Sequence, residues 1–139
     1  SDVERKHLFG ATETEHLSPD AYGPEANARV YNILAEKAGR IIAAGHSVIV
    51  DAVFGKPDER AAIAVQSAAA NVAFHGLFLV ADLHTRLNRV GGRSLDASDA
   101  GVVVVRQQEA ITLGEVDWTK IDASGPFDST LAHARAALG

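Results

Sequence analysis

A run of three β-branched residues that ends in a carboxylate is the feature that most constrains this chain. The run spans Val48 to Val50, and Asp51 follows it at once. Such a run is typical of a strand buried on both faces of a parallel sheet, and we expect this strand to cover residues 47–54. In open α/β sheets, ligands bind beyond the carboxyl ends of the strands. Asp51 is therefore a candidate functional residue, although a carboxylate here could also simply cap the next turn.

The composition fits one ordinary globular domain. The chain has 139 residues, 47% of them hydrophobic, and its formal net charge of -5 argues against a general nucleic-acid surface. The absence of cysteine excludes disulfides, thiol nucleophiles and cysteine-based metal sites. No apolar run reaches the roughly 18 residues of a membrane span, and no secretory signal opens the chain. We therefore expect no nucleic-acid or membrane partner and, by default, a cytoplasmic location.

Helical and strand patterns alternate along the chain. A second buried strand is expected in the latter half of residues 72–80, and a short last strand over residues 118–122. Because a helical pattern separates the first two strands, they are expected to form a parallel pair with a right-handed crossover. The expected helices cover residues 2–9, 25–44, 57–70 and 127–138, a stretch capped by Asp82 that runs to about residue 90, and residues 102–114.

Three arginines occur at helical spacing in the second half of the chain. Arg86, Arg89 and Arg93 step by three and four residues, so a helix would align them on one face. Guanidinium groups on one face repel one another unless an anion lies between them, and arginine matches phosphate oxygens in a bidentate way. The alternative is a solvated basic face. Gly91 and Gly92 would allow the chain to bend here, as a lid hinge does.

The first helix offers a second pairing of charges. Arg5 follows Asp2 by three residues, so both can lie on one helix face. This pairing is ambiguous, because a capping residue and a solvated ion pair give the same pattern.

Several kinds of site are excluded by their missing motifs. No two of the six histidines have the i, i+4 spacing of a helical zinc pair. The sequence has no G-x-S-x-G nucleophile elbow and no G-x-x-x-x-G-K-[ST] phosphate loop.

Several short motifs nevertheless occur together in an order typical of one family. They are Ser1-Asp2-x-x-Arg5-Lys6, Asp51-Ala52-Val53-Phe54, Arg60, Arg89-x-x-x-Arg93, Asp96-Ala97-Ser98-Asp99 and Arg106-Gln107. In this order, the chain resembles the P-loop kinase-like ATP-binding domain that is often fused behind aminoglycoside-phosphotransferase-like domains. That domain is related to gluconate kinase, polynucleotide kinase and zeta-toxin-type kinases. The resemblance covers essentially the whole chain and implies a three-layer α/β fold of the P-loop NTPase type with a parallel sheet.

The resemblance also implies a reaction, the transfer of a phosphoryl group from Mg-ATP to the hydroxyl of a small-molecule acceptor. Asp2 would orient or deprotonate that hydroxyl, and Asp51 would lie near Mg²⁺ or the acceptor. Arg5 would hold the acceptor or a phosphate, and Phe54 and Arg60 would bind the acceptor. Phosphoryl transfer consists mainly of positioning and charge neutralisation, so carboxylates and guanidinium groups suit it.

The ATP phosphates would be bound from the second half of the chain. Arg89 and Arg93 resemble the lid arginines of the family, and Arg106 resembles a further phosphate-facing arginine. The lid region would cover residues 89–106.

The sequence departs from the family pattern at its start. In the family, a strand, the phosphate loop, a helix and a second strand precede the position of Ser1, and this sequence contains none of them. We therefore expect residues 1–139 to form a single partial domain with weak or no ATP turnover. The strands at residues 47–54 and 72–80 would pair directly, or a partner chain would fill the gap between them. An exposed strand edge favours such a homodimer or strand-swapped oligomer.

Two other functions stay open on this sequence. One is a non-catalytic binding or dimerisation module that keeps the kinase scaffold. The other is an unrelated small α/β domain with solvated charges, which requires the motif order to be a coincidence. The phosphoryl acceptor is not readable, because a fold does not fix a substrate.

Overall fold

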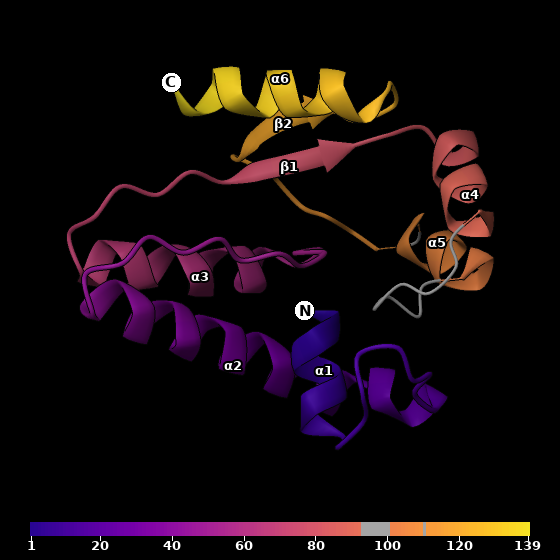
Figure 1. The fold of residues 1–139 in the computed structure, drawn as a ribbon, viewed down its shortest axis with the longest axis horizontal. Helices are drawn as coiled ribbons and strands as arrows, with labels where there is room; N and C mark the ends of the chain where they lie inside the picture. Colours follow the sequence, from indigo (N-terminus) through magenta and orange to yellow (C-terminus); the bar gives the residue numbers. More distant parts are fainter. Residues whose placement is uncertain (93–100, 110) are drawn as a thin grey trace. The chain divides into compact units, whose positions relative to one another are not determined.

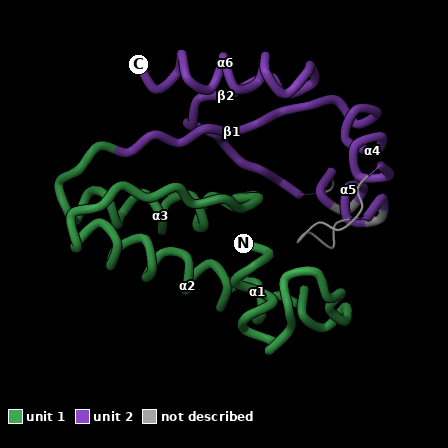
Figure 2. Tube along the Cα trace, in the orientation of Figure 1, with its two compact units in different colours: residues 1–73, 94–99 green, residues 74–93, 100–139 purple. Residues whose placement is uncertain are grey.

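The computed structural model of the protein describes residues 1–92, 101–109 and 111–139 (Figure 1). These residues form two compact units (Figure 2). Unit 1 contains residues 1–73, and unit 2 contains the described residues from 74 onward. The prediction that residues 1–139 form a single partial domain stays a prediction.

Unit 1 is helical. Its elements are α1 (Asp2–Leu8), the 3-10 helix η1 (Pro19–Tyr22), α2 (Pro24–Ala43) and α3 (Pro57–Ala69). Pro24 and Pro57 each stand at a helix start, where the missing N–H costs nothing and the fixed φ suits the helix. The helices predicted over residues 2–9, 25–44 and 57–70 are thereby confirmed to within a few residues at their ends.

The core of unit 1 lies where α2 meets its neighbours. α2 packs against both α1 and α3, and its stripe buries Val30 and Ala38, while α3 buries Ile63. The Lys37 ammonium also pairs with the Glu4 carboxylate at 2.6 Å and so joins α2 to α1. Because both side chains are partly exposed, this ion pair contributes at most about 1 kcal/mol. Apolar packing is therefore the main force that holds these helices together.

The buried strand predicted over residues 47–54 is wrong. These residues connect α2 to α3 without pairing with any strand in the part of the chain described, and the Ile49 side chain is 96% exposed. A strand needs neighbours that accept and donate its main-chain hydrogen bonds. No strand occurs among residues 1–73 to supply them. The local β-branched signal is present, but the pairing that would convert it into a strand is not.

Unit 2 contains the parallel sheet. Strand β1 (Leu77–Val80) pairs in parallel with β2 (Thr119–Asp122), with Leu77 opposite Thr119 and Val80 opposite Asp122. Both strands were predicted, but the partner predicted for β1 was the segment at residues 47–54, and that pairing is wrong. The fold is a helix-rich α/β arrangement with a small parallel sheet.

Three helices complete the described part of unit 2. They are α4 (Leu83–Gly91), α5 (Val102–Glu109) and α6 (Phe127–Leu138). α4 packs against α5, and α6 packs against β2 (Figure 1). Helices were predicted in all three regions, although α5 is shorter than the predicted 102–114.

The indole of Trp118 packs against Gly76 where the two strands begin. A Cβ atom added at Gly76 would lie 2.4 Å from the Trp118 ring, and the Thr119 N–H donates to the Gly76 carbonyl at 2.9 Å. The Phe74 ring meets the indole edge-on, with centroids 5.6 Å apart. Trp118 is thus a packing residue at the sheet.

No helix within the described ranges is both long and apolar enough to cross a membrane.

Candidate functional site

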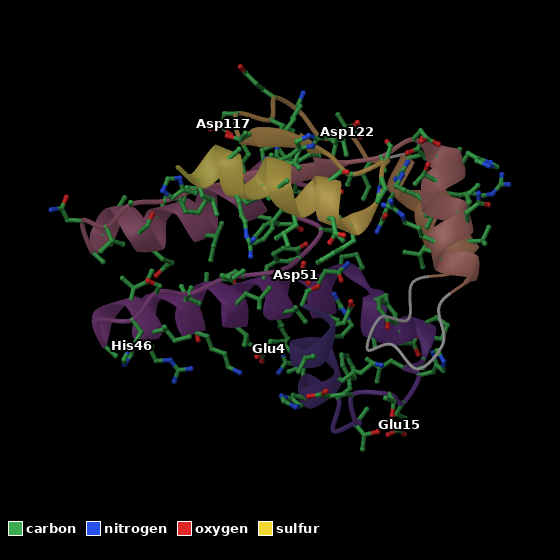
Figure 3. The ribbon with its side chains drawn as sticks, turned by 45° about the horizontal axis from the view of Figure 1, so that its top comes forward. Glu4, Glu15, His46, Asp51, Asp117 and Asp122 are labelled. Atoms are coloured by element: carbon green, nitrogen blue, oxygen red, sulfur yellow. The ribbon has the colours of Figure 1, made fainter. Side chains whose placement is uncertain are left out.

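Asp2 and Asp51 are brought near one another by the main chain. The nitrogen of Ser1 donates to the Asp51 carbonyl oxygen at 2.6 Å, so the start of α1 adjoins the segment that connects α2 to α3. Asp2 is half-buried as the first residue of α1, whereas Asp51 is exposed on the connecting segment (Figure 3). Unit 1 therefore holds two carboxylates in adjoining segments.

The carboxylates of the described residues suit Mg²⁺ only in a limited role. Among the described residues, no group of three or more histidine, aspartate or glutamate side chains could hold a metal ion. Mg²⁺, however, keeps several waters and commonly uses only one or two carboxylates together with substrate phosphates. An exposed Asp51 fits this limited role, and a site formed by protein ligands alone does not fit the described residues.

Arg5 is one of the two buried charges of α1, together with Lys6. Its side chain is 6% exposed, its Nη1 donates to the Ala21 carbonyl at 2.7 Å, and its guanidinium lies 4.9 Å from the centroid of the Tyr22 ring. The Nε atom is buried without a hydrogen-bond partner. The ring face offsets part of the cost of burying this charge. Arg5 therefore anchors η1 and keeps one donor unused.

The main chain of Phe54 is held from two helices. Its N–H donates to the Tyr31 hydroxyl on α2 at 3.0 Å, and its carbonyl accepts from Nη1 of Arg60 on α3 at 2.9 Å. Phe54 and Arg60 are both buried. The φ angle of Phe54 is 47°, in the left-handed region that a bulky residue seldom adopts. Two hydrogen bonds therefore maintain a backbone conformation that is unfavourable by itself.

Tyr31 connects α2 to Phe54, and it was not among the site residues predicted from the sequence. Its ring meets the Phe54 ring edge-on at 5.5 Å. Burial raises the pKa of the Tyr31 phenol to about 12, and the charge of the Glu59 carboxylate adds to this rise, while the hydrogen bond from the Phe54 N–H and the charge of Arg5 oppose it. One signal in the sequence could have identified Tyr31. It follows Val30 in an otherwise aliphatic stripe, and a tyrosine hydroxyl in such a place needs a hydrogen-bond partner.

Glu59 continues this contact into the start of α3. Its Oε2 accepts from the Lys56 N–H at 3.0 Å, and its negative charge acts on the Tyr31 phenol. Tyr31, Glu59, Phe54 and Arg60 thus form one connected group, which we call the Phe54 clamp.

The predicted phosphate-binding arginines behave differently from one another. Nη1 of Arg89 donates to the Ala123 carbonyl and its Nη2 to the Gly125 carbonyl, each at 2.5 Å. Arg86, on the same helix, forms an ion pair with Glu109. Arg106 is exposed on α5. Arg93 lies outside the described residues, as does much of the predicted lid at 89–106. Helix α4 thus carries Arg86 and Arg89 as predicted, and both already have protein partners.

The carboxylates that follow β1 and β2 cap local structure. Asp82 accepts from the Thr85 N–H at 2.9 Å and from its hydroxyl at 2.7 Å, and these hydrogen bonds lower the pKa of Asp82. Asp122 accepts from the Ser124 N–H at 2.9 Å, and this bond likewise lowers the pKa of Asp122. The predicted cap at Asp82 is confirmed, and both carboxylates are occupied by the turns they stabilise.

Comparison with known families decides the class of the protein. A family model described as an AAA domain matches residues 1–112. The chain belongs to this AAA domain family. Its members are P-loop kinase-like domains, so the resemblance drawn from the motifs is confirmed. The chain is therefore a P-loop NTPase-like domain of the nucleotide-binding type. The match covers every candidate site residue, and it ends before β2 and α6. Neither the curated proteins nor the solved structures gave a match to this AAA domain.

Proposed function

We propose that this chain is part of a small-molecule kinase that transfers a phosphoryl group from Mg-ATP to a hydroxyl acceptor. The observation that supports this most is the connection between the predicted acceptor-side residues in unit 1. Asp51 bonds to the start of α1, which carries Asp2 and Arg5. Three residues further on, Phe54 bonds to Arg60. Membership of a P-loop kinase-like family supports the same assignment.

The proposed roles follow from the chemistry of each side chain. Asp2 accepts the proton of the acceptor hydroxyl, and the positive charge of Arg5 attracts the acceptor or a phosphate. Asp51 holds Mg²⁺, which would neutralise charge on the ATP phosphates when bound. The phosphoryl group itself needs little covalent help from the protein, since positioning and charge neutralisation supply most of the catalysis.

In this proposal, arginines in the second half of the chain bind the ATP phosphates. Arg106 is exposed and available, while Arg89 would exchange its carbonyl acceptors for phosphate oxygens. Arg93 has the same role in the family pattern. The 139 residues contain no phosphate loop, whose N–H groups and lysine normally cradle the phosphates. We therefore propose weak binding and little or no turnover by these residues alone.

Calorimetric titration with Mg-ATP tests this proposal. We expect weak binding to the unmodified chain and its loss in Arg93→Ala and Arg106→Ala. Arg135→Ala is the matched control, because it removes an exposed arginine from α6, beyond the residues matched by the family. Equal binding by all four proteins would contradict the proposed lid arginines, and no binding by any of them would contradict an ATP site in this chain.

The gene provides a second test, which needs no protein. A phosphate-loop motif should be encoded within about 50 residues before Ser1, the length of a βαβ unit and its flanks. Its absence there would exclude an active P-loop kinase and leave the non-catalytic function.

The second candidate function is a binding or dimerisation module on the same scaffold. The specific observation in its favour is the connecting segment, where β-branched residues carry the 96% exposed Ile49 side chain. In this candidate the segment pairs with a second copy of the chain as a homodimer or strand-swapped oligomer. Light scattering should then show a dimer that Ile49→Asp dissociates. Val65→Asp, which alters an exposed valine on α3, should leave it intact. A monomer at all concentrations would exclude this candidate.

A further inference from the structure

The segment from Asp51 to Phe54 is held at both ends. At its start, the Asp51 carbonyl accepts from the Ser1 nitrogen at 2.6 Å. At its end, the Phe54 N–H donates to the Tyr31 hydroxyl at 3.0 Å and the Phe54 carbonyl accepts from Arg60 at 2.9 Å. Only Ala52 and Val53 lie between these anchors. A change in the conformation of Phe54 would therefore be transmitted to Asp51 over a very short path.

The conformation of Phe54 depends on outside support. Its φ of 47° lies in the left-handed region, where a residue with a Cβ atom is less stable than in the ordinary regions. Such a conformation persists only when the surroundings determine it. Here the surroundings include these two hydrogen bonds and the edge-on contact with the Tyr31 ring at 5.5 Å.

The Tyr31 hydroxyl does more than fill space. It accepts from the Phe54 N–H, and it lies under the influence of the Glu59 carboxylate, whose Oε2 accepts from the Lys56 N–H. A phenylalanine at this position would fill nearly the same volume and pack the same ring. What the hydroxyl adds is a fixed distance between α2 and the turn that begins α3.

We propose that Tyr31 is a positioning residue whose hydroxyl fixes the Phe54 turn and thereby sets where the Asp51 carboxylate and the Phe54 ring lie. The placement of the turn follows from contacts within unit 1 alone. Only the use of that placement, to hold a divalent cation at Asp51, rests on the proposed function. Tyr31 touches neither acceptor nor cation in this proposal, and it acts through Phe54.

Amide exchange measured by nuclear magnetic resonance tests the first part. Tyr31→Phe keeps the ring and removes the hydroxyl, so we expect the Phe54 amide to exchange about tenfold faster and the Asp51 amide signal to shift. Asn32→Ala is the matched control, because it removes a polar group from the next, exposed residue of α2. Exchange at Phe54 and a signal at Asp51 that match the unmodified protein would overturn the proposal.

A cation titration tests the second part with a readout that packing alone would not move. Mn²⁺ added without nucleotide should broaden the Asp51 amide signal, and Tyr31→Phe should require a several-fold higher Mn²⁺ concentration. Equal Mn²⁺ dependence in Tyr31→Phe and the unmodified protein would overturn the link from Tyr31 to Asp51. Asp51→Asn should abolish the broadening. If Mn²⁺ leaves Asp51 unaffected in the unmodified protein, the proposed cation role of Asp51 fails, and the exchange experiment still decides the role of Tyr31.

A second variant keeps the test decisive if Tyr31→Phe does not fold. Glu59→Gln retains the size of the side chain and the Tyr31 hydroxyl but removes the carboxylate that acts on this hydroxyl by its charge and accepts from the Lys56 N–H. We expect a smaller increase in Phe54 amide exchange, of about three- to fivefold, since a neutral acceptor forms a weaker hydrogen bond than a carboxylate. No increase would contradict the clamp.

Discussion

The hydroxyl of Tyr31 lies 3.0 Å from the main-chain nitrogen of Phe54 and accepts its hydrogen bond. This contact joins the middle of α2 to the turn before α3, although the two residues lie 23 positions apart. It also places a partly buried phenol near the Glu59 carboxylate. The titration of Tyr31 should therefore report the state of the clamp.

We predict that Tyr31 ionises near pH 12, two units above an ordinary tyrosine. Burial and Glu59 favour the neutral phenol in the folded protein. The stabilisation is fully present below the unfolded pKa, near 10, and is lost as the pH rises through the folded value. Tyr22→Phe leaves Tyr31 as the only tyrosine of the two, so phenolate absorbance in this variant reports Tyr31 alone. Ionisation near pH 10 in the folded protein would contradict the burial of Tyr31.

Denaturation at two pH values provides the control for this titration. The free energy of unfolding should fall between pH 9 and pH 11.5 by more in the unmodified protein than in Tyr31→Phe, which has no phenol at this position to ionise. An equal fall in the two proteins would assign the alkaline loss of stability to other groups.

A second prediction concerns the other half of the clamp. Arg60→Met retains much of the apolar stem of a 3% exposed side chain but removes the donor to the Phe54 carbonyl. We expect the free energy of unfolding in urea to fall by about 1–3 kcal/mol, the usual cost of losing a hydrogen bond from a charged group. Arg29→Met, which alters an exposed arginine on α2, should change it by less than about 0.5 kcal/mol. Equal stability of the two variants would show that the Arg60 contact is not significant.

The elements with local signals were predictable from the sequence. Residues 25–44 combine an apolar stripe with Pro24 at one end and Gly45 at the other, and the structure has a helix at Pro24–Ala43. The strands at Leu77–Val80 and Thr119–Asp122 were also predicted from local sequence signals. The strand predicted at Val48 was wrong because a strand needs a neighbouring strand to pair with. The run of β-branched residues does not by itself supply that neighbour.

The same distinction between local signals and distant contacts applies to the candidate site. Asp2, Arg5 and Arg60 were found through the order of short motifs, which needs no knowledge of contacts. Tyr31 was missed because its role depends on the Phe54 N–H, and a helical pattern does not reveal which distant group a buried hydroxyl meets. Arg89 was predicted as a phosphate ligand from the motif order, and that role stays a prediction. Its carbonyl acceptors lie more than 30 positions away and could not be foreseen from the sequence.

A third prediction uses the packing of Trp118 on Gly76. Gly76→Ala would place a Cβ atom 2.4 Å from the ring, so the indole would have to move. Crowding of this kind costs about 1–3 kcal/mol, and the emission of the only tryptophan should shift as the ring moves. Gly91→Ala is the control, because its Cβ would meet nothing within 4 Å and alanine favours a helix. Unchanged emission and stability in Gly76→Ala would contradict this packing.

The last prediction concerns Arg89, whose guanidinium holds the turn between β2 and α6. Its two terminal nitrogens donate to the carbonyls of Ala123 and Gly125, a forked contact that a lysine ammonium cannot reproduce, because it lacks the planar geometry. Arg89→Ala should therefore increase hydrogen exchange in peptides covering residues 123–127, and Arg89→Lys should give an intermediate increase. Arg135→Ala, an exposed arginine on α6 itself, should leave exchange there unchanged. If Arg89→Ala also leaves it unchanged, the guanidinium is not needed to hold the turn, and its predicted use as a phosphate ligand would carry no cost to the fold.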